Sequence, residues 1–149
     1  IQSLIDDMLS TVKEYSGVGL AAPQVGVSKR IFIVSPSQRQ VYPHSSIEDS
    51  LVVINPTLQL SKGAKVQDWE GCLSIPGIRG QVLRSENIQV DYTNRIGELK
   101  SEEYDGFIAR IFQHEYDHLE GIVFLDRMKS IKSLISEKEY LKLFETDEA

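Results

Sequence analysis

Hydrophobic residues recur with helical spacing near both ends of the chain. Over residues 1–12 they lie three or four positions apart, which predicts an amphipathic helix from residue 1 to about residue 15. The same spacing over residues 130–144 predicts a second amphipathic helix. A third helix is expected from about residue 105 to residue 120, where Gly121 provides a stop signal.

The middle of the chain has the pattern of strands. RIFIV (residues 30–34) predicts a buried strand, and LVVIN (residues 51–55) predicts another that Pro56 closes. Between them, residues 35–50 are polar, contain two prolines and predict a loop. NIQVDYT and ELKSEEY flank the turn-forming NRIG and predict a hairpin. This order of elements predicts a single α+β domain over residues 1–149, with short mixed or antiparallel strands.

Composition narrows the class of protein. The chain of 149 residues is 41% hydrophobic and 26% charged, as expected for a globular domain that can bury a core. The net charge of −6 argues against direct nucleic-acid binding, because phosphate recognition relies on clustered Lys and Arg. No apolar run approaches the length of a membrane span, and no signal peptide opens the chain. The first residue is Ile1 rather than Met, which leaves open whether an N-terminal segment is missing.

The segment QHEYDHLEG (residues 113–121) contains two of the three histidines. His114 and His118 are four residues apart, so both rings leave the predicted helix on one side, within an arc roughly 60° wide that Phe107 and Ile111 share. Neutral imidazoles on a buried face need partners, and one interpretation is two core histidines held by hydrogen bonds. The spacing favours two ligands of one metal, with Glu115 placed to handle protons of a bound water.

A catalytic metal needs a third protein ligand. Cys72 is the only cysteine, which excludes a disulfide within the chain, suggests a reducing compartment and leaves three roles: buried filler, nucleophile or metal ligand. No histidine follows His118, and His44 lies in the polar loop, where a ligand role is not favoured. Cys72, His114 and His118 would form a Cys–His–His site with the fourth position open to water, as in catalytic centres.

A third segment, GVGLAAPQVG (residues 17–26), combines glycines with an isolated amide. Gln24 follows Pro23 in an otherwise apolar stretch, an unusual place for an amide unless it contacts something specific. The simple alternative is a helix-to-strand loop. The Lys and Ser/Thr of a phosphate-binding loop are absent.

Together, GVGLAAPQVG, EGCLSIPG (residues 70–77) and QHEYDHLEG resemble the three signature motifs of peptide deformylase, in the same order and at the same separations. The resemblance covers nearly the whole chain. VYPH (residues 41–44) and the run over residues 107–128 are similar to the bacterial and plastid branch of the family. Members usually carry an extended segment before the first helix, which again leaves open whether an N-terminal segment is missing.

The resemblance implies a metal-dependent hydrolase that removes the formyl group from N-formylmethionine at the start of new polypeptides and releases formate. Cys72, His114 and His118 would hold the metal, with water as fourth ligand, on a central helix around which the strands pack. Glu115 would act as general base and acid, and Gln24 with the backbone N–H of Leu73 would stabilise the oxyanion. The implied substrate contacts are Val18, Gly19, Gly71, Phe107, Ile111 and Arg79.

The same resemblance sets expectations for cofactor, partners and compartment. One divalent metal is expected, Fe²⁺ in cells, with Zn²⁺, Ni²⁺ and Co²⁺ also compatible with two imidazoles and a thiolate. The partners would be N-formylmethionyl nascent peptides. The mixed Lys and Glu residues of the predicted C-terminal helix leave two docking surfaces open, the domain itself and the ribosome. The bacterial type implies the cytoplasm, with a plastid or another organelle as the alternative. Two other functions stay open: an endopeptidase of the H-E-x-x-H type, and a non-catalytic module that a metal stabilises.

Overall fold

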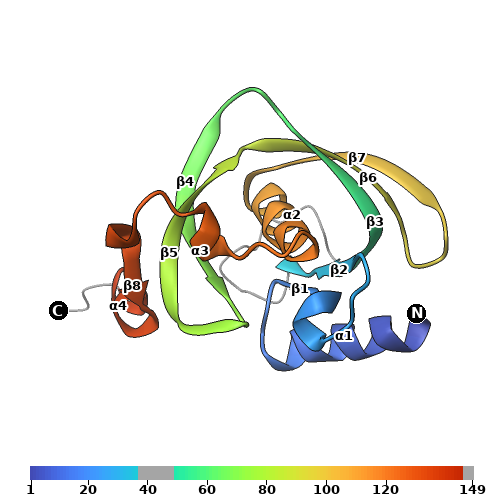
Figure 1. The fold of residues 1–149 in the computed structure, drawn as a ribbon, viewed down its shortest axis with the longest axis horizontal. Coiled ribbons are helices and arrows are strands. Elements are labelled where there is room, and N and C mark those ends of the chain that lie inside the picture. The colour runs from blue at the N-terminus through green and yellow to red at the C-terminus, as the bar shows by residue number, and fades with distance from the viewer. Residues whose placement is uncertain (37–48, 146–149) are drawn as a thin grey trace.

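The computed structural model describes residues 1–36 and 49–145. Most of the predicted loop over residues 35–50, including His44 and the VYPH segment, lies outside the described residues. The α+β expectation is confirmed: helices and antiparallel sheets surround one central helix (Figure 1). No helix in the described part of the chain combines the length and the apolar character that a membrane crossing requires.

The strands form two sheets, and every pairing between them in the described residues is antiparallel. The first sheet has the order β1 (Gly19–Ala21), β2 (Ile31–Val34), β3 (Leu51–Leu60), β6 (Asn87–Thr93) and β7 (Leu99–Asp105). The second has the order β4 (Lys65–Cys72), β5 (Ile75–Ser85) and β8 (Leu134–Ser136). The predicted hairpin over NRIG is confirmed as the β6–β7 pair.

The helix predicted to carry the histidines is α2 (Gly106–Leu119), and it lies between the two sheets (Figure 1). The N-terminal helix α1 (Gln2–Glu14) covers the other face of β1 and β2. Near the C-terminus follow two short helices, α3 (Phe124–Arg127) and α4 (Glu137–Lys142).

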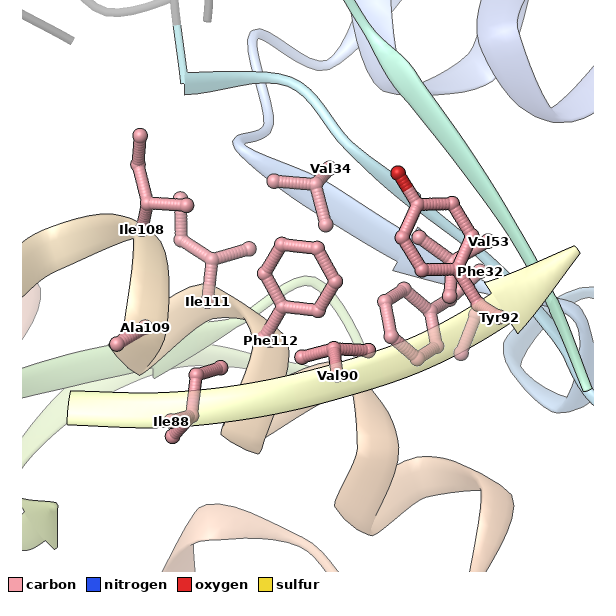
Figure 2. Packing of buried hydrophobic residues seen from close by; sticks show 11 residues of the cluster. Phe32, Val34, Val53, Ile88, Val90, Tyr92, Ile108, Ala109, Ile111 and Phe112 are labelled. Carbon is pink, nitrogen blue, oxygen red and sulfur yellow. The ribbon is translucent and has the colours of Figure 1, made fainter. Parts of the chain in front are cut away.

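Strand β2 separates two hydrophobic clusters, which explains why RIFIV is apolar at every position after Arg30. Phe32 and Val34 face α2, where they pack with Phe112 and with Val90 of β6 (Figure 2). Ile31 and Ile33 face the opposite way and pack against α1. Alternate side chains of a strand point to opposite faces, so a strand covered by helices on both sides is apolar throughout.

The prediction that Pro56 closes the second strand is wrong. Strand β3 continues through Pro56 to Leu60. Its pairing with β6 shifts register between Ile54 and Thr57, and Asn55 adopts a positive φ of 50°. Because proline has no N–H for the ladder, a β-bulge is one of the few places where a paired strand accepts it.

The helix predicted over residues 130–144 is also shorter than expected. Residues 131–133 form a 3₁₀ turn, β8 follows, and α4 has only six residues. The β8 strand pairs with β5 through Leu134 opposite Gly80 and Ser136 opposite Ile78. Ser136 then caps α4 by accepting a hydrogen bond from the N–H of Glu139 at 3.2 Å. Pairing with a distant strand has therefore overridden the local helical spacing.

Candidate metal centre and substrate pocket

The fold brings the three predicted ligands together from two elements. Cys72 ends β4, and His114 and His118 project from one side of α2. Sγ of Cys72 lies 3.3 Å from Nε2 of His118, which in turn lies 3.3 Å from Nε2 of His114. All three donor atoms lie within 4.8 Å of one another, a spacing that a single metal ion can span.

The partner of His114 fixes which ring nitrogen faces the cluster. Nδ1 of His114 lies 2.8 Å from Oε1 of Glu70, which is itself buried. Burial would raise the pKa of Glu70, but hydrogen bonds from His114 and Arg84 outweigh it and hold that pKa well below its usual range. Glu70 is therefore a carboxylate that can only accept, so Nδ1 donates to it and Nε2 is the ring nitrogen that faces Cys72 and His118.

Glu70 belongs to a buried network of charges behind the histidines. Arg84 donates to both carboxylate oxygens of Glu70 at 2.9 Å, and Arg110 donates to Oε2 at 2.7 Å. Arg84 also donates to Asp117 at 2.6 Å, and Arg127 completes that carboxylate's partners from α3. Fully paired buried charges of this kind hold the ligand-bearing helix against β4 and β5.

The sequence did not single out Glu70, Arg84, Arg110 or Asp117. Two signals could have done so. Glu70 is the first residue of the motif that contains Cys72. Arg84 ends the segment GQVLR (residues 80–84) and lies two positions after the apolar Val82, so both side chains are on the buried face of the strand. Metal-binding histidines commonly donate their second N–H to a carboxylate, and Glu70, two residues before Cys72, is a candidate for that carboxylate.

We expect Glu70→Gln to weaken both the centre and the fold. The amide keeps a carbonyl oxygen but loses the charge that Arg84 and Arg110 share, and breaking a buried ion pair typically costs about 3 kcal/mol or more. Loss of such a partner typically lowers metal affinity by about 10–100-fold. Thermal unfolding and competition with a metal chelator measure the two effects. Glu103→Gln, an exposed site with the same charge change, is the control, and equal behaviour of the two variants would contradict this role of Glu70.

The thiol of Cys72 is readily ionised in this environment. Burial would raise its pKa, but hydrogen bonds from His114 and His118 outweigh it and lower the pKa from 9.0 to about 5. A metal binds the thiolate, so the side chain is prepared for a ligand role. The interpretation of Cys72 as inert buried filler does not account for these contacts.

Glu115 lies beside the histidines with one oxygen unsatisfied. Within the described residues, its Oε2 and the hydroxyl of Ser85 are the buried side-chain polar atoms that have no hydrogen-bond partner. Burial raises the pKa of Glu115 to about 7, although His114 and His118 act in the opposite direction. Such a group exchanges protons near neutral pH, and its unsatisfied oxygen calls for a partner such as water or substrate.

Gln24 does point at something specific, as its unusual position in the sequence indicates. It lies in a 3₁₀ turn (Ala22–Val25) directly after β1. Its Oε1 accepts a hydrogen bond from the N–H of Ala21 at 2.9 Å, and this contact orients the amide so that Nε2 points toward Cys72. Nε2 donates to Sγ of Cys72 at 3.5 Å and to the hydroxyl of Ser74 at 3.0 Å.

A pocket of about 370 Å³ opens onto this cluster. The predicted substrate and oxyanion residues all line it, namely Val18, Gly19, Gln24, Gly71, Leu73, Arg79, Phe107 and Ile111. Leu73 lies in the turn between β4 and β5, directly after Cys72. Phe107 and Ile111 come from α2, about two turns and one turn before His114, respectively.

At Gly19 and Gly71 the backbone lies so close to a neighbouring side chain that a Cβ would not fit unless that side chain moved. A Cβ on Gly19 would lie 2.6 Å from Oε1 of Glu115, and a Cβ on Gly71 would lie 2.7 Å from the side chain of Arg79. Both distances are shorter than ordinary contacts of a Cβ atom, so any other residue at these positions would force the side chain of Glu115 or Arg79 to shift. The glycines of the two motifs therefore let backbone pass beside Glu115 on one side of the pocket and beside Arg79 on the other.

Comparison with known proteins gives one consistent answer. The sequence profile described as polypeptide deformylase matches residues 1–134. Peptide deformylase 2 of Nostoc sp. is 48% identical over 143 residues, covering 96% of this chain and 80% of that protein. The peptide deformylase of Desulfitobacterium hafniense is 47% identical over 129 residues, covering 87% of this chain and 79% of that protein.

Solved structures agree with the sequence comparison. The class I type b peptide deformylase of Acinetobacter baumannii with Met-Ala-Ser bound superposes with a TM-score of 0.78 at 43% identity, over 85% of this chain and 80% of that one. The peptide deformylase of Thermotoga maritima gives a TM-score of 0.76 at 40% identity, over 87% and 81% of the two chains. The chain therefore belongs to the polypeptide deformylase family, the hydrolases that remove the formyl group from N-formylmethionine at the start of new polypeptides.

Proposed function

We propose that Cys72, His114 and His118 hold the catalytic metal that the family implies, and that the pocket beside them binds the formylated end of a nascent peptide. The convergence of the three donor atoms within 4.8 Å carries this assignment. A divalent metal bound there would lower the pKa of a water molecule and polarise the formyl carbonyl. The buried carboxylate of Glu70 holds His114 with Nε2 directed at the cluster.

Glu115 is proposed as the group that moves protons. Its buried position and its pKa of about 7 suit a carboxylate that takes a proton from the attacking water and returns one to the leaving amine. The unsatisfied Oε2 supports this role, because a buried oxygen without a partner in the protein can accept a hydrogen bond from the attacking water.

Gln24 and Leu73 are proposed to stabilise the oxyanion. The hydrogen bond from Ala21 holds the amide of Gln24 with Nε2 toward Cys72, so a donor is already oriented when charge develops. The backbone N–H of Leu73, in the turn directly after Cys72, can serve as the second donor. Donors fixed in advance are effective because they need little reorganisation during the reaction.

The peptide backbone is proposed to add to the free edge of β1. Strand β1 is the outermost strand of its sheet. The carbonyl of Val18 accepts from the N–H of Ser35 at 2.7 Å, so the next residue, Gly19, directs its own N–H and C=O to the open edge. Pairing with a sheet edge is a common way to bind an extended peptide. Gly71 lies across the pocket, and Phe107 with Ile111 form an apolar wall for the methionine side chain.

The two other functions fit the site less well. Endopeptidases of the H-E-x-x-H type take their third ligand from downstream of the second histidine, whereas Cys72 lies upstream of His114. A structural metal site is closed by four protein ligands, and the candidate metal cluster found among the described residues has three. The ribosome as a partner and the compartment stay predictions.

A pair of peptides tests the substrate assignment. Formyl-Met-Ala-Ser should release formate in proportion to enzyme and time, and its unformylated twin should remain intact. Cleavage of an internal bond in the unformylated peptide would favour the endopeptidase instead.

We further propose Fe²⁺ as the physiological metal, with Zn²⁺, Ni²⁺ and Co²⁺ as substitutes that the same ligands accept. A thiolate beside Fe²⁺ is exposed to oxidants, and the chain has no second cysteine that could protect Cys72 as a disulfide. The iron form should therefore lose activity in air or peroxide faster than the zinc or nickel form. Activity measured over time for each metal form checks this, and equal lifetimes in peroxide would count against it.

A further inference from the structure

The C-terminal helix reaches the mouth of the pocket. Glu137 and Tyr140 of α4 line it together with residues from β4 and β5. They are brought there by β8, which pairs with β5 so that Ile135 lies opposite Arg79. The segment that breaks the predicted helix therefore places α4 beside β5 (Figure 1), where Glu137 and Tyr140 line the pocket.

Arg79 is held by two groups of this helix. Its Nε donates to Oε2 of Glu137 at 2.6 Å, and a second guanidinium nitrogen donates to Oε1 at 3.1 Å. The guanidinium also lies over the ring of Tyr140, 4.7 Å from its centre. The guanidinium of Arg79 is planar, so two hydrogen bonds to one carboxylate and a contact with one aromatic face together fix its orientation.

The ion pair is placed where a substrate would meet it. The Arg79 side chain passes so close to Gly71 that a Cβ there would lie 2.7 Å from it, and Gly71 directly precedes the proposed ligand Cys72. Arg79 has 14% of its side chain exposed and Glu137 has 38%, so both can be reached from the pocket. The two opposite charges cancel at this position.

We propose that Glu137 determines specificity, by neutralising Arg79 so that the pocket discriminates little between acidic and basic side chains after the formylmethionine. This rests on the proposed function, because it concerns the same peptide in the same pocket. Removal of the Glu137 charge leaves Arg79 as an unbalanced cation, which favours an acidic side chain. Removal of the Arg79 charge takes away the cation that pairs with Glu137 and so shifts the preference toward a basic side chain.

The experiment compares kcat/KM for matched peptides with Asp or Lys at the second position (formyl-Met-Asp-Ser, formyl-Met-Lys-Ser) and at the third (formyl-Met-Ala-Asp, formyl-Met-Ala-Lys). In Glu137→Gln the Asp-to-Lys ratio should rise about three-fold at one of the positions, as expected for partly exposed charges, and the rise should shrink at high salt. In Arg79→Gln the ratio should fall. In the double variant it should return toward the parent.

Glu139→Gln is the matched control. It lies on the same helix and removes the same charge, but Glu139 pairs with Lys142 at 2.9 Å and does not line the pocket. Its ratio should equal that of the parent. A loosened helix would lower kcat/KM for both peptides of a pair and leave their ratio unchanged, so the ratio separates specificity from a structural role.

An unchanged ratio at both positions in Glu137→Gln and in Arg79→Gln would overturn the proposal, provided that the parent releases formate from formyl-Met-Ala-Ser. If the parent releases none, the proposed function fails instead. The two failures are therefore distinguishable in the same set of assays.

Discussion

Glu115→Gln is expected to fold, to retain its metal and to lose about 10²–10⁴-fold in turnover, the range typical of general acid–base catalysis. Gln is nearly isosteric with Glu, and the three donor atoms of Cys72, His114 and His118 are untouched. The amide cannot take a proton from the attacking water or pass one to the leaving amine. The loss should appear in kcat for formyl-Met-Ala-Ser, with metal content measured on the same sample.

Glu120→Gln is the matched control for this variant. Glu120 follows the last residue of α2, is exposed and pairs with Arg30 at 2.8 Å, so the same change of charge there should leave turnover within a few-fold of the parent. If Glu115→Gln also stays within a few-fold, another group is the base. If it unfolds or loses its metal, Glu115 is structural and the non-catalytic interpretation gains support.

Cys72→Ala is expected to lose metal and activity together, because two histidines rarely retain a catalytic metal without a third ligand. Each role of Cys72 gives a different result. Buried filler would leave metal and activity in place, a nucleophile would leave the metal and abolish activity, and a ligand removes both. Metal content after gel filtration and formate release distinguish the three outcomes. Full metal occupancy in the variant would refute the ligand role.

Much of the fold could be predicted because its local patterns are strong. The continuous apolar run of β2 and the arc of α2 that Phe107 and Ile111 share with the histidines both indicate burial, and the structure places both elements between other layers. The antiparallel hairpin over NRIG likewise follows from local alternation. Periodicity reports burial well when the neighbours cover a whole face.

Features that depend on distant pairing could not be predicted in the same way. The β8 strand forms because Leu134 and Ser136 pair with residues of β5 that lie more than 50 positions earlier in the chain. No local pattern over residues 130–144 predicts that pairing. The continuation of β3 past Pro56 depends on a bulge opposite β6, which only the pairing reveals. Local patterns therefore misplaced the end of β3 and missed β8.

The same distinction applies to the candidate site, where residues with restricted chemistry could be predicted and residues whose role depends on distant partners could not. The ligand-type residues His114, His118 and Cys72 could be proposed because spacing and chemistry restrict their roles. Glu70 and Arg84 could not, because a carboxylate in a strand has many ordinary roles until its partners are known. Their contacts with His114 and with each other appear only when β4, β5 and α2 pack together.

The most direct test of the metal centre is titration of the metal-free protein. Chelation should abolish formate release from formyl-Met-Ala-Ser, and addition of Fe²⁺ without oxygen, or of Ni²⁺, should restore it in proportion to metal bound, reaching a plateau at one ion per chain. The Cys72→Ala variant carried through the same titration should show no such plateau. Full activity in the metal-free protein, or recovery in the variant equal to that of the parent, would contradict the assignment of Cys72, His114 and His118 as the site.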